Sequence, residues 1–123
     1  METATPTRTA EQLVTELFDI IDGRRWDELG SVFADDCVYR RPGYEPIVGL
    51  ARLQHFYRHE RIVASGEHSI EHTVSDLGTV VCWGTFTGES EAGRPLDEGF
   101  ADVYRVRDGK IAQRRTYFYR PGI

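Results

Sequence analysis

Three polar side chains stand where they could act together on a bound organic molecule. Asp22 ends an apolar segment near the N-terminus, and His68 and His72 lie in a later segment in which polar and apolar residues alternate. A carboxylate that accepts a hydrogen bond from one imidazole nitrogen fixes the tautomer of the ring and favours its protonated form. The other nitrogen can then take and return a proton. Such general acid–base catalysis contributes roughly 10²–10⁴-fold to a rate.

The two histidines compete for this role. In a regular strand they share one face with Ile70 and Val74, because side chains alternate between faces. They would then lie ~13 Å apart at ~3.3 Å per residue, too far for one carboxylate to contact both. We favour His68, although each histidine could instead be a core or rim residue bonded to a backbone carbonyl. Asp22 has its own alternative role, since Asp-Gly is a common pair at helix ends and turns.

A second acid, Asp102, alternates with Phe100, Tyr104 and Val106 along a predicted strand. A neutral acid at such a position could donate a hydrogen bond to a developing oxyanion, which makes Asp102 a further catalytic candidate. The alternative is an ion pair with an arginine. The candidate partners are Arg41, Arg114 and Arg115.

Arg41 and several aromatic residues are candidates for binding the substrate. If Arg41 points inward, it would bind an anionic or enolate oxygen; if outward, it is a solvated residue at a strand edge. The aromatic side chains that could line a pocket for a flat or cyclic ligand are Tyr39, Tyr44, Tyr57, Trp83, Phe86, Tyr104 and Phe118. Their alternative role is packing in the core or at a dimer face.

Composition excludes several classes of function. The 123 residues correspond to one domain, and the formal net charge of −5 argues against a nucleic-acid-binding protein. We expect no metal, because the His, Cys and acidic residues match no ligand spacing. No apolar run approaches the ~20 residues of a membrane helix. Cys37 and Cys82 form no CxxC motif, which favours two free thiols in the cytoplasm.

The elements follow from hydrophobic periodicity. An i, i+3, i+4 stripe predicts a long helix from Ala10 to the stop at Gly23, preceded by a flexible lead-in over residues 1–9. Shorter helices are expected at 26–33 and 50–64, and strands at 37–41, 67–75, 79–88, 97–107 and 110–119. Early helices followed by consecutive strands predict an α+β domain. Its curved antiparallel sheet would wrap around the long helix and leave a pocket at the open end.

The order and spacing of three motifs resemble those of known proteins. Trp26-Asp27-Glu28-Leu29, Phe33-Ala34-Asp35-Asp36 and Phe100-Ala101-Asp102-Val103-Tyr104 are similar to segments of SnoaL-like proteins in the nuclear transport factor two and ketosteroid isomerase superfamily. The resemblance implies a single SnoaL-like domain over 10–123, with a cone-shaped α+β barrel. It also implies a homodimer formed through the sheet and a cofactor-free site for a small molecule.

Within that resemblance, several familiar catalytic positions are changed. Arg41 stands where ketosteroid isomerases carry their general-base aspartate, and Leu17 stands at their first-helix tyrosine. Asp102 matches their second oxyanion-hole acid. Thr116 takes the place of the acid that cyclases and epoxide hydrolases carry on the last strand, and we count it among the substrate-binding candidates.

The dehydratase-like members match better. They carry an aspartate four residues before the tryptophan of the second helix, as Asp22 precedes Trp26, and a histidine on the strand that here holds His68 and His72. We therefore expect an isomerase, cyclase or dehydratase that acts on an apolar cyclic or polyketide-like molecule. The alternative is a non-catalytic binding or assembly domain of the same fold.

Overall fold

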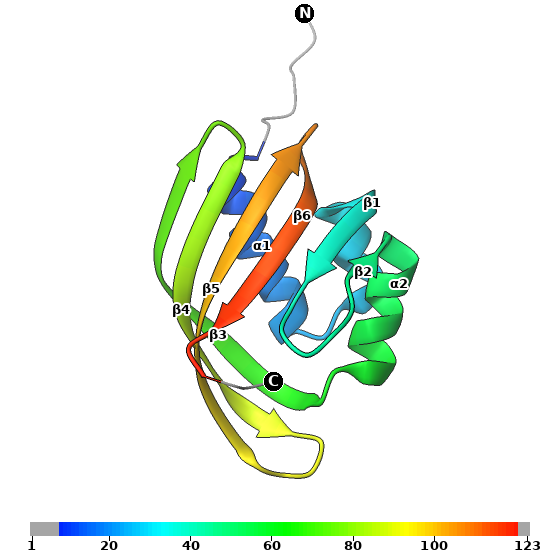
Figure 1. Cartoon of the computed structure of the whole chain (residues 1–123), viewed down its shortest axis with the longest axis vertical. Coiled ribbons are helices and arrows are strands. Elements are labelled where there is room, and N and C mark those ends of the chain that lie inside the picture. Colours follow the sequence, from blue (N-terminus) through cyan, green and yellow to red (C-terminus); the bar gives the residue numbers. More distant parts are fainter. Residues whose placement is uncertain (1–7, 121–123) are drawn as a thin grey trace, which may run out of the picture.

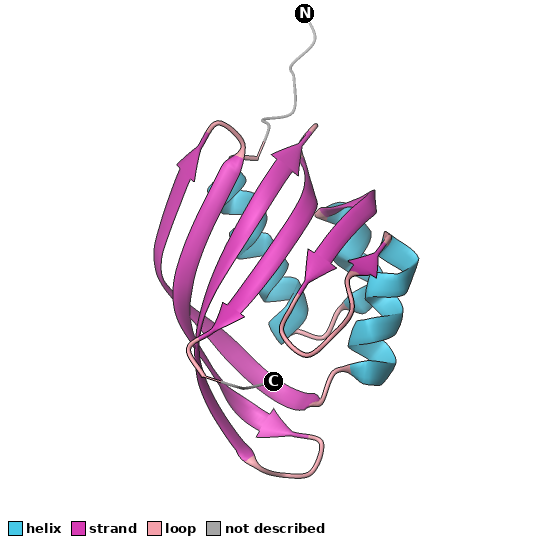
Figure 2. Cartoon of the chain, in the orientation of Figure 1, coloured by secondary structure: helices cyan, strands magenta, loops and turns pink. Residues whose placement is uncertain are grey.

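A six-stranded sheet curves around the first helix without closing (Figure 1). The computed structural model describes residues 8–120. The strand order is β2-β1-β6-β5-β4-β3. Neighbours pair antiparallel except β1 and β6, which run parallel. Figure 2 shows the long helix crossing behind the sheet, with the shorter helices beside its β1–β2 end. The predicted α+β fold with a curved sheet is confirmed.

The elements have the following bounds. The helices are α1 (Ala10–Asp22), the 3₁₀ helix η1 (Trp26–Ser31), α2 (Leu50–His55) and the π-helical turn η2 (Phe56–Glu60). The strands are β1 (Phe33–Arg40), β2 (Ile47–Val48), β3 (Val63–Asp76), β4 (Thr79–Ser90), β5 (Pro95–Arg107) and β6 (Lys110–Phe118).

Helix α1 forms where its apolar stripe predicted it. Thr9 and Gln12 make reciprocal side-chain-to-backbone hydrogen bonds of 3.0 and 2.8 Å, a capping box that satisfies the free N–H groups of the first turn. Leu13, Leu17 and Ile21 are buried against the concave face of the sheet. The helix ends at Asp22, which brings this carboxylate beside β3.

Three predicted boundaries are wrong in detail. The strand expected at 37–41 begins at Phe33, because the segment expected to end a helix already pairs with β6. The helix expected at 50–64 stops at Glu60. Its last turn is π-helical, with the Arg61 amide N–H donating to the Phe56 carbonyl at 2.9 Å. Of the remaining residues of that predicted helix, Arg61 and Ile62 form a short connection, and Val63 and Ala64 already belong to β3.

A bulge in β3 overturns the expectation that the two histidines share a face. Ile70 pairs with Gly84, but His72 pairs with Trp83, so Glu71 is an extra residue without its own partner on β4. Such a bulge reverses the alternation of every residue beyond it. His68 therefore points inward, while His72 is exposed, with its ring centre 5.1 Å from that of Trp83 in a tilted arrangement.

The predicted lead-in lies mostly outside the described residues. Of its last two residues, Thr9 caps α1, and Arg8 pairs with Glu16 at 2.7 Å and donates to the Ser31 carbonyl at 2.8 Å. These two residues are therefore part of the folded domain.

No helix within residues 8–120 is long and apolar enough to span a bilayer.

Candidate active site

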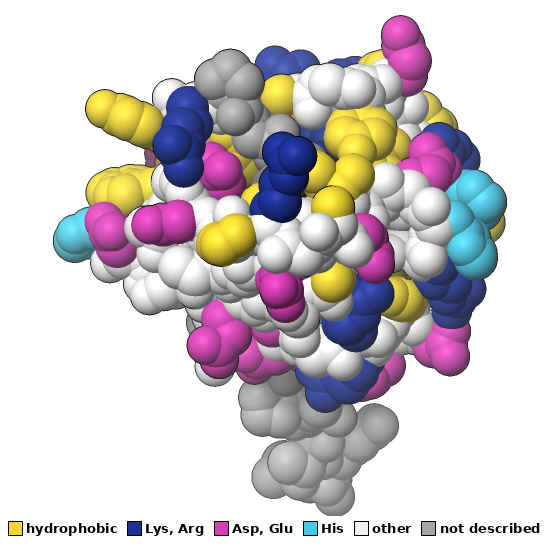
Figure 3. Space-filling model, turned by 90° about the horizontal axis from the view of Figure 1, so that it is seen from below, with side chains coloured by type: hydrophobic (Ala, Val, Ile, Leu, Met, Phe, Trp, Pro, Cys, Tyr) yellow, Lys and Arg dark blue, Asp and Glu magenta, His cyan; other side chains and the backbone are white. Residues whose placement is uncertain are grey.

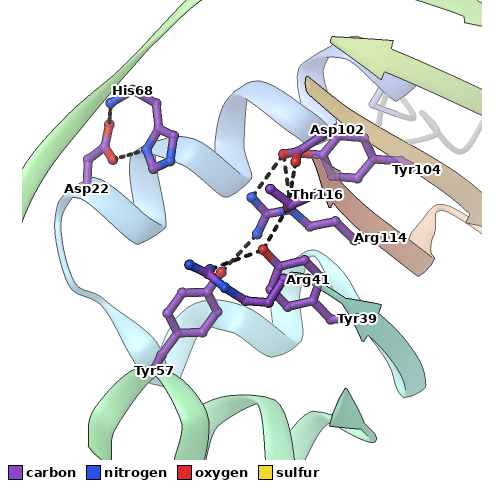
Figure 4. Close-up of polar contacts among 9 residues, drawn as sticks. All are labelled: Asp22, Tyr39, Arg41, Tyr57, His68, Asp102, Tyr104, Arg114 and Thr116. Carbon is purple, nitrogen blue, oxygen red and sulfur yellow. Dashed lines mark hydrogen bonds and ion pairs between the residues drawn. The ribbon is translucent and has the colours of Figure 1, made fainter. Parts of the chain in front are cut away.

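The end of α1 and the inner half of β3 join Asp22 to His68. One Asp22 carboxylate oxygen accepts the backbone N–H of His68 at 2.9 Å, and the other lies 2.5 Å from Nδ1 of the same residue. A carboxylate can only accept hydrogen bonds, so Nδ1 carries the proton of the neutral ring. The sequence left open which histidine Asp22 contacts, and the geometry selects His68 (Figure 4).

Aromatic rings hold the imidazole of His68 in place. The centre of the imidazole ring lies 4.6 Å from the ring centre of Phe18, 4.7 Å from that of Phe86 and 5.4 Å from that of Phe100. Only 9% of the His68 side chain is exposed. Burial is the largest influence on its pKa and lowers it, although the hydrogen bond and the charge of Asp22 act in the opposite direction. The net lowering favours a neutral imidazole near pH 7.

The second ring nitrogen of His68 is available as a base. No group of the described residues forms a hydrogen bond with Nε2. This atom lies across the ring from Asp22, and the side chain lines an internal cavity. A neutral imidazole with a bound Nδ1–H and an open Nε2 is the arrangement that a general base requires.

The cavity lies between α1, η2 and the concave face of the sheet. Its free volume is about 20 Å³, which is room for about one water molecule. The residues that line it are Ile21, Tyr39, Arg41, Tyr57, Arg61, His68, Phe86, Phe100, Arg114, Thr116 and Phe118. A larger ligand can enter only if some of these side chains move.

Beside the cavity, Asp102 is the centre of a buried hydrogen-bond network. It accepts two hydrogen bonds from Arg114, at 2.9 and 3.2 Å, and one each from Tyr104 and Thr116, both at 2.6 Å. Asp102 is fully buried and Arg114 is 4% exposed. Burial is the largest single influence on the pKa of Arg114 and lowers it, but Asp102 and the neighbouring tyrosines together raise that pKa well above its usual value.

This network decides between the two alternatives for Asp102. Its oxygens accept from three partners, and the side chain does not line the cavity. The ion pair with an arginine is therefore the correct alternative, and Arg114 is the partner. Asp102 acts on the cavity only through Arg114 and Thr116, both of which line it.

Arg114 carries the network on to the tyrosines. Its Nη1 donates to the Tyr57 hydroxyl at 2.8 Å, and its guanidinium lies 4.6 Å from the ring centre of Tyr39. The Tyr39 hydroxyl is 2.7 Å from Thr116 Oγ1. Burial raises the pKa of Tyr57, against the opposing charge of Arg114. The Tyr57 phenol is therefore a neutral hydrogen-bonding group of the cavity wall.

Arg41 points inward, the first of its two alternatives. It is 7% exposed, donates to the Tyr39 hydroxyl at 3.2 Å, and its guanidinium lies 5.2 Å from the ring centre of Phe56 and 5.4 Å from that of Phe118. Arg41 therefore adds a cationic group to the cavity wall.

Some predicted residues lie away from the cavity. Trp83 is 38% exposed on the outer face of the sheet, with His72. Tyr104 is buried behind the wall, where it serves Asp102. Tyr44 packs edge-on against Phe56 at 5.0 Å without lining the cavity. The bulge in β3 explains His72, and strand alternation places Trp83 on the face opposite Phe86.

Sequence reasoning assigned no site role to Arg61, Phe100 or Ile21, all of which line the cavity. Phe100 and Ile21 belonged to apolar patterns that predicted core packing. Arg61 lies in the charged run Tyr57-Arg58-His59-Glu60-Arg61, a pattern that is typical of a solvated helix face. Only the early end of the helix, together with the π-helical turn, brings Arg61 inward.

No three His, Cys, Asp or Glu side chains of residues 8–120 gather as metal ligands would. Cys37 and Cys82 are free and buried, and burial raises their pKa values to about 11 and about 12. Neither thiol is therefore a reactive nucleophile at neutral pH.

Comparison with known proteins identifies the family and the fold. The family model described as "SnoaL-like domain" matches residues 14–114. No curated protein sequence matches the chain.

Solved structures share the fold at low sequence identity. A protein from Jannaschia sp. CCS1, proposed to be a SnoaL-like polyketide cyclase, has a TM-score of 0.80 at 16% identity, over 97% of this chain and 92% of that one. IdmH, proposed to be a polyketide cyclase of Streptomyces antibioticus, has a TM-score of 0.78 at 16% identity, over 91% and 93%. An epoxide hydrolase of M. tuberculosis, similar to LEH, has a TM-score of 0.74 at 23% identity, over 87% and 80%.

Proposed function

The chain belongs to the SnoaL-like domain family, and on that premise we propose that it is a cofactor-independent enzyme that moves protons on a small organic molecule. The reaction class is isomerisation, cyclisation or dehydration of a cyclic or polyketide-like substrate. One observation supports this most strongly: the partly buried Asp22–His68 pair, whose histidine lines the cavity and has an Nε2 without a hydrogen-bond partner among the described residues.

The pair suggests the order of proton transfers. Nε2 of neutral His68 removes a proton from carbon or from a hydroxyl group of the substrate, and the ring becomes an imidazolium. Asp22 stabilises that cation through the 2.5 Å contact with Nδ1. The imidazolium then returns the proton to another atom, or to a leaving hydroxyl group. Arg41 and Arg114 stabilise the negative charge that develops on the substrate oxygen.

Asp102 takes a positioning role in this scheme. It holds Arg114 by two hydrogen bonds and orients the hydroxyl of Thr116 by accepting its hydrogen bond. A donor role for Asp102 toward an oxyanion is not retained, because its acceptor oxygens are already occupied by Arg114, Tyr104 and Thr116.

Hydrogen–deuterium exchange would test the base without knowledge of the natural substrate. A panel of cyclic β-diketones and β-keto esters is incubated in D₂O, and deuterium incorporation is followed by NMR. We expect the protein to accelerate exchange for some members. We expect His68→Gln to abolish this and Asp22→Asn to slow it by roughly 10²–10⁴-fold. His72→Gln is the matched control and should match the parent.

If every accelerated compound exchanged as fast with His68→Gln as with the parent protein, His68 would not be the base. If no member of the panel were accelerated, binding assays with the same compounds would decide between catalysis and the second candidate function.

The second candidate is a binding domain without catalysis. The free volume of about 20 Å³ favours it, because the hollow is nearly filled by its own side chains. Compounds that bind with His68 in contact, but neither exchange nor react, would support this candidate over the enzyme.

A further inference from the structure

The cavity wall carries an excess of positive charge. Three arginines, Arg41, Arg61 and Arg114, line it together with His68, and no acidic side chain of the described residues lines it. The nearest carboxylates are already engaged, Asp102 by Arg114 and Asp22 by His68. A ligand with negative charge would therefore meet a complementary site.

Arg61 is the member of this set that nothing in the described chain neutralises. Its Nε is buried without a hydrogen-bond partner, and no described acid forms an ion pair with its guanidinium. The group lies 5.4 Å from the ring centre of Tyr57 and 5.6 Å from that of Phe86. The Arg61 side chain is partly buried. Partial burial of a cation without a carboxylate costs stability, which the aromatic faces offset in part and a bound anion would offset further.

The environment of the Arg61 guanidinium also favours a bound anion. Burial lowers the pKa of Arg61, so the fold disfavours the charge it holds there. Viewed from below, the surface carries Lys and Arg side chains interspersed with acidic ones (Figure 3). On this face, the arginines of the cavity are therefore not the continuation of a uniformly basic surface.

We propose that Arg61 binds a planar oxyanion of the substrate, a carboxylate or an ionised enol or phenol, and so restricts the enzyme to anionic substrates. This inference rests on the proposed function, because it identifies the substrate class of the same cavity. A guanidinium suits such a group, since its planar set of N–H donors matches two oxygens in one plane. The anion would lie between Arg61 and Arg41, with the reacting atom toward His68.

Binding of simple probes tests this directly. Benzoate is compared with neutral benzamide, and para-nitrophenolate with para-nitroanisole, by ligand-observed NMR at low salt. We expect each anion to bind roughly tenfold or more tightly than its neutral counterpart, and Arg61→Met to remove that preference. Arg58→Gln is the matched control, because Arg58 lies in η2, three residues before Arg61, but pairs with Asp27 and does not line the cavity.

Two further measurements separate this inference from the proposed function. Apo Arg61→Met should have a melting temperature equal to or higher than the parent, since a partly buried cation without an acidic partner among the described residues is removed. His68→Gln should lose proton exchange but keep the preference for anions. Anionic and neutral probes that bind the parent equally well would overturn the role of Arg61. That result would leave the His68 mechanism intact, because the exchange assay tests it separately.

Discussion

Replacing Asp102 with alanine would test the buried network that holds Arg114 beside the cavity. The substitution removes the acceptor of two arginine hydrogen bonds and of the Tyr104 and Thr116 hydroxyls. It leaves a guanidinium that is 4% exposed without its counter-charge. Breaking a buried pair from one side costs about 3–5 kcal/mol. For a domain of this length that corresponds to a fall of roughly 10–20 °C in melting temperature.

The double variant Asp102→Leu with Arg114→Met gives the decisive comparison. It removes both charges at once, so it should be more stable than Asp102→Leu alone, although it carries one more substitution. Urea denaturation at constant protein concentration measures all the variants against the parent. A loss below about 1 kcal/mol for Asp102→Ala would refute the reasoning, since that is the contribution of an exposed pair. A double variant less stable than Asp102→Leu would refute it equally.

Two other predictions concern the elements around His68. The lowered pKa of His68 means that the unfolded chain takes up this proton first as the pH falls. The contribution of the neutral ring to stability is therefore complete above pH 6.5, the ordinary histidine pKa, and is lost as the pH falls below it. Urea midpoints across this range should decline less steeply in His68→Gln than in the parent, and equal slopes would contradict the assignment. A Cβ added at Gly84 would collide with the Ser69 carbonyl, so Gly84→Ala should destabilise the protein by roughly 1–3 kcal/mol in the same assay. Gly99→Ala is its control, because that Cβ would lie 3.4 Å from the nearest atom, and a similar loss in both variants would disprove the steric explanation.

The architecture was predictable because hydrophobic periodicity is a local signal. The stripe through Leu13, Leu17 and Ile21 predicted α1, and all three residues are buried. The alternation after Gly66 predicted the late strands. The parallel pairing of β1 with β6 was not predictable, because it depends on contacts between segments far apart in the sequence.

The site was predictable in its chemistry but not in its geometry. The sequence offered Asp22 with two histidines, and only the extra residue at Glu71 separates the inward His68 from the exposed His72. A bulge has no reliable sequence signature, so strict alternation placed both rings on one face. Arg61 was missed for a similar reason, because an arginine in a charged run is usually solvated.

The π-helical turn η2 is one residue wider than an ordinary helical turn. The number of residues in this turn is therefore as important as their types. Five residues rather than four separate the amide of Arg61 from the carbonyl it binds at Phe56. Deleting one residue from 56–60 would restore ordinary helical phase and rotate Tyr57 and Arg61 relative to each other. Deletion of one residue could therefore change which side chains face the cavity, without substitution of any residue that lines it. Divergence of substrate preference among such domains could proceed by insertions and deletions in this turn, without any change in the residues that perform proton transfer.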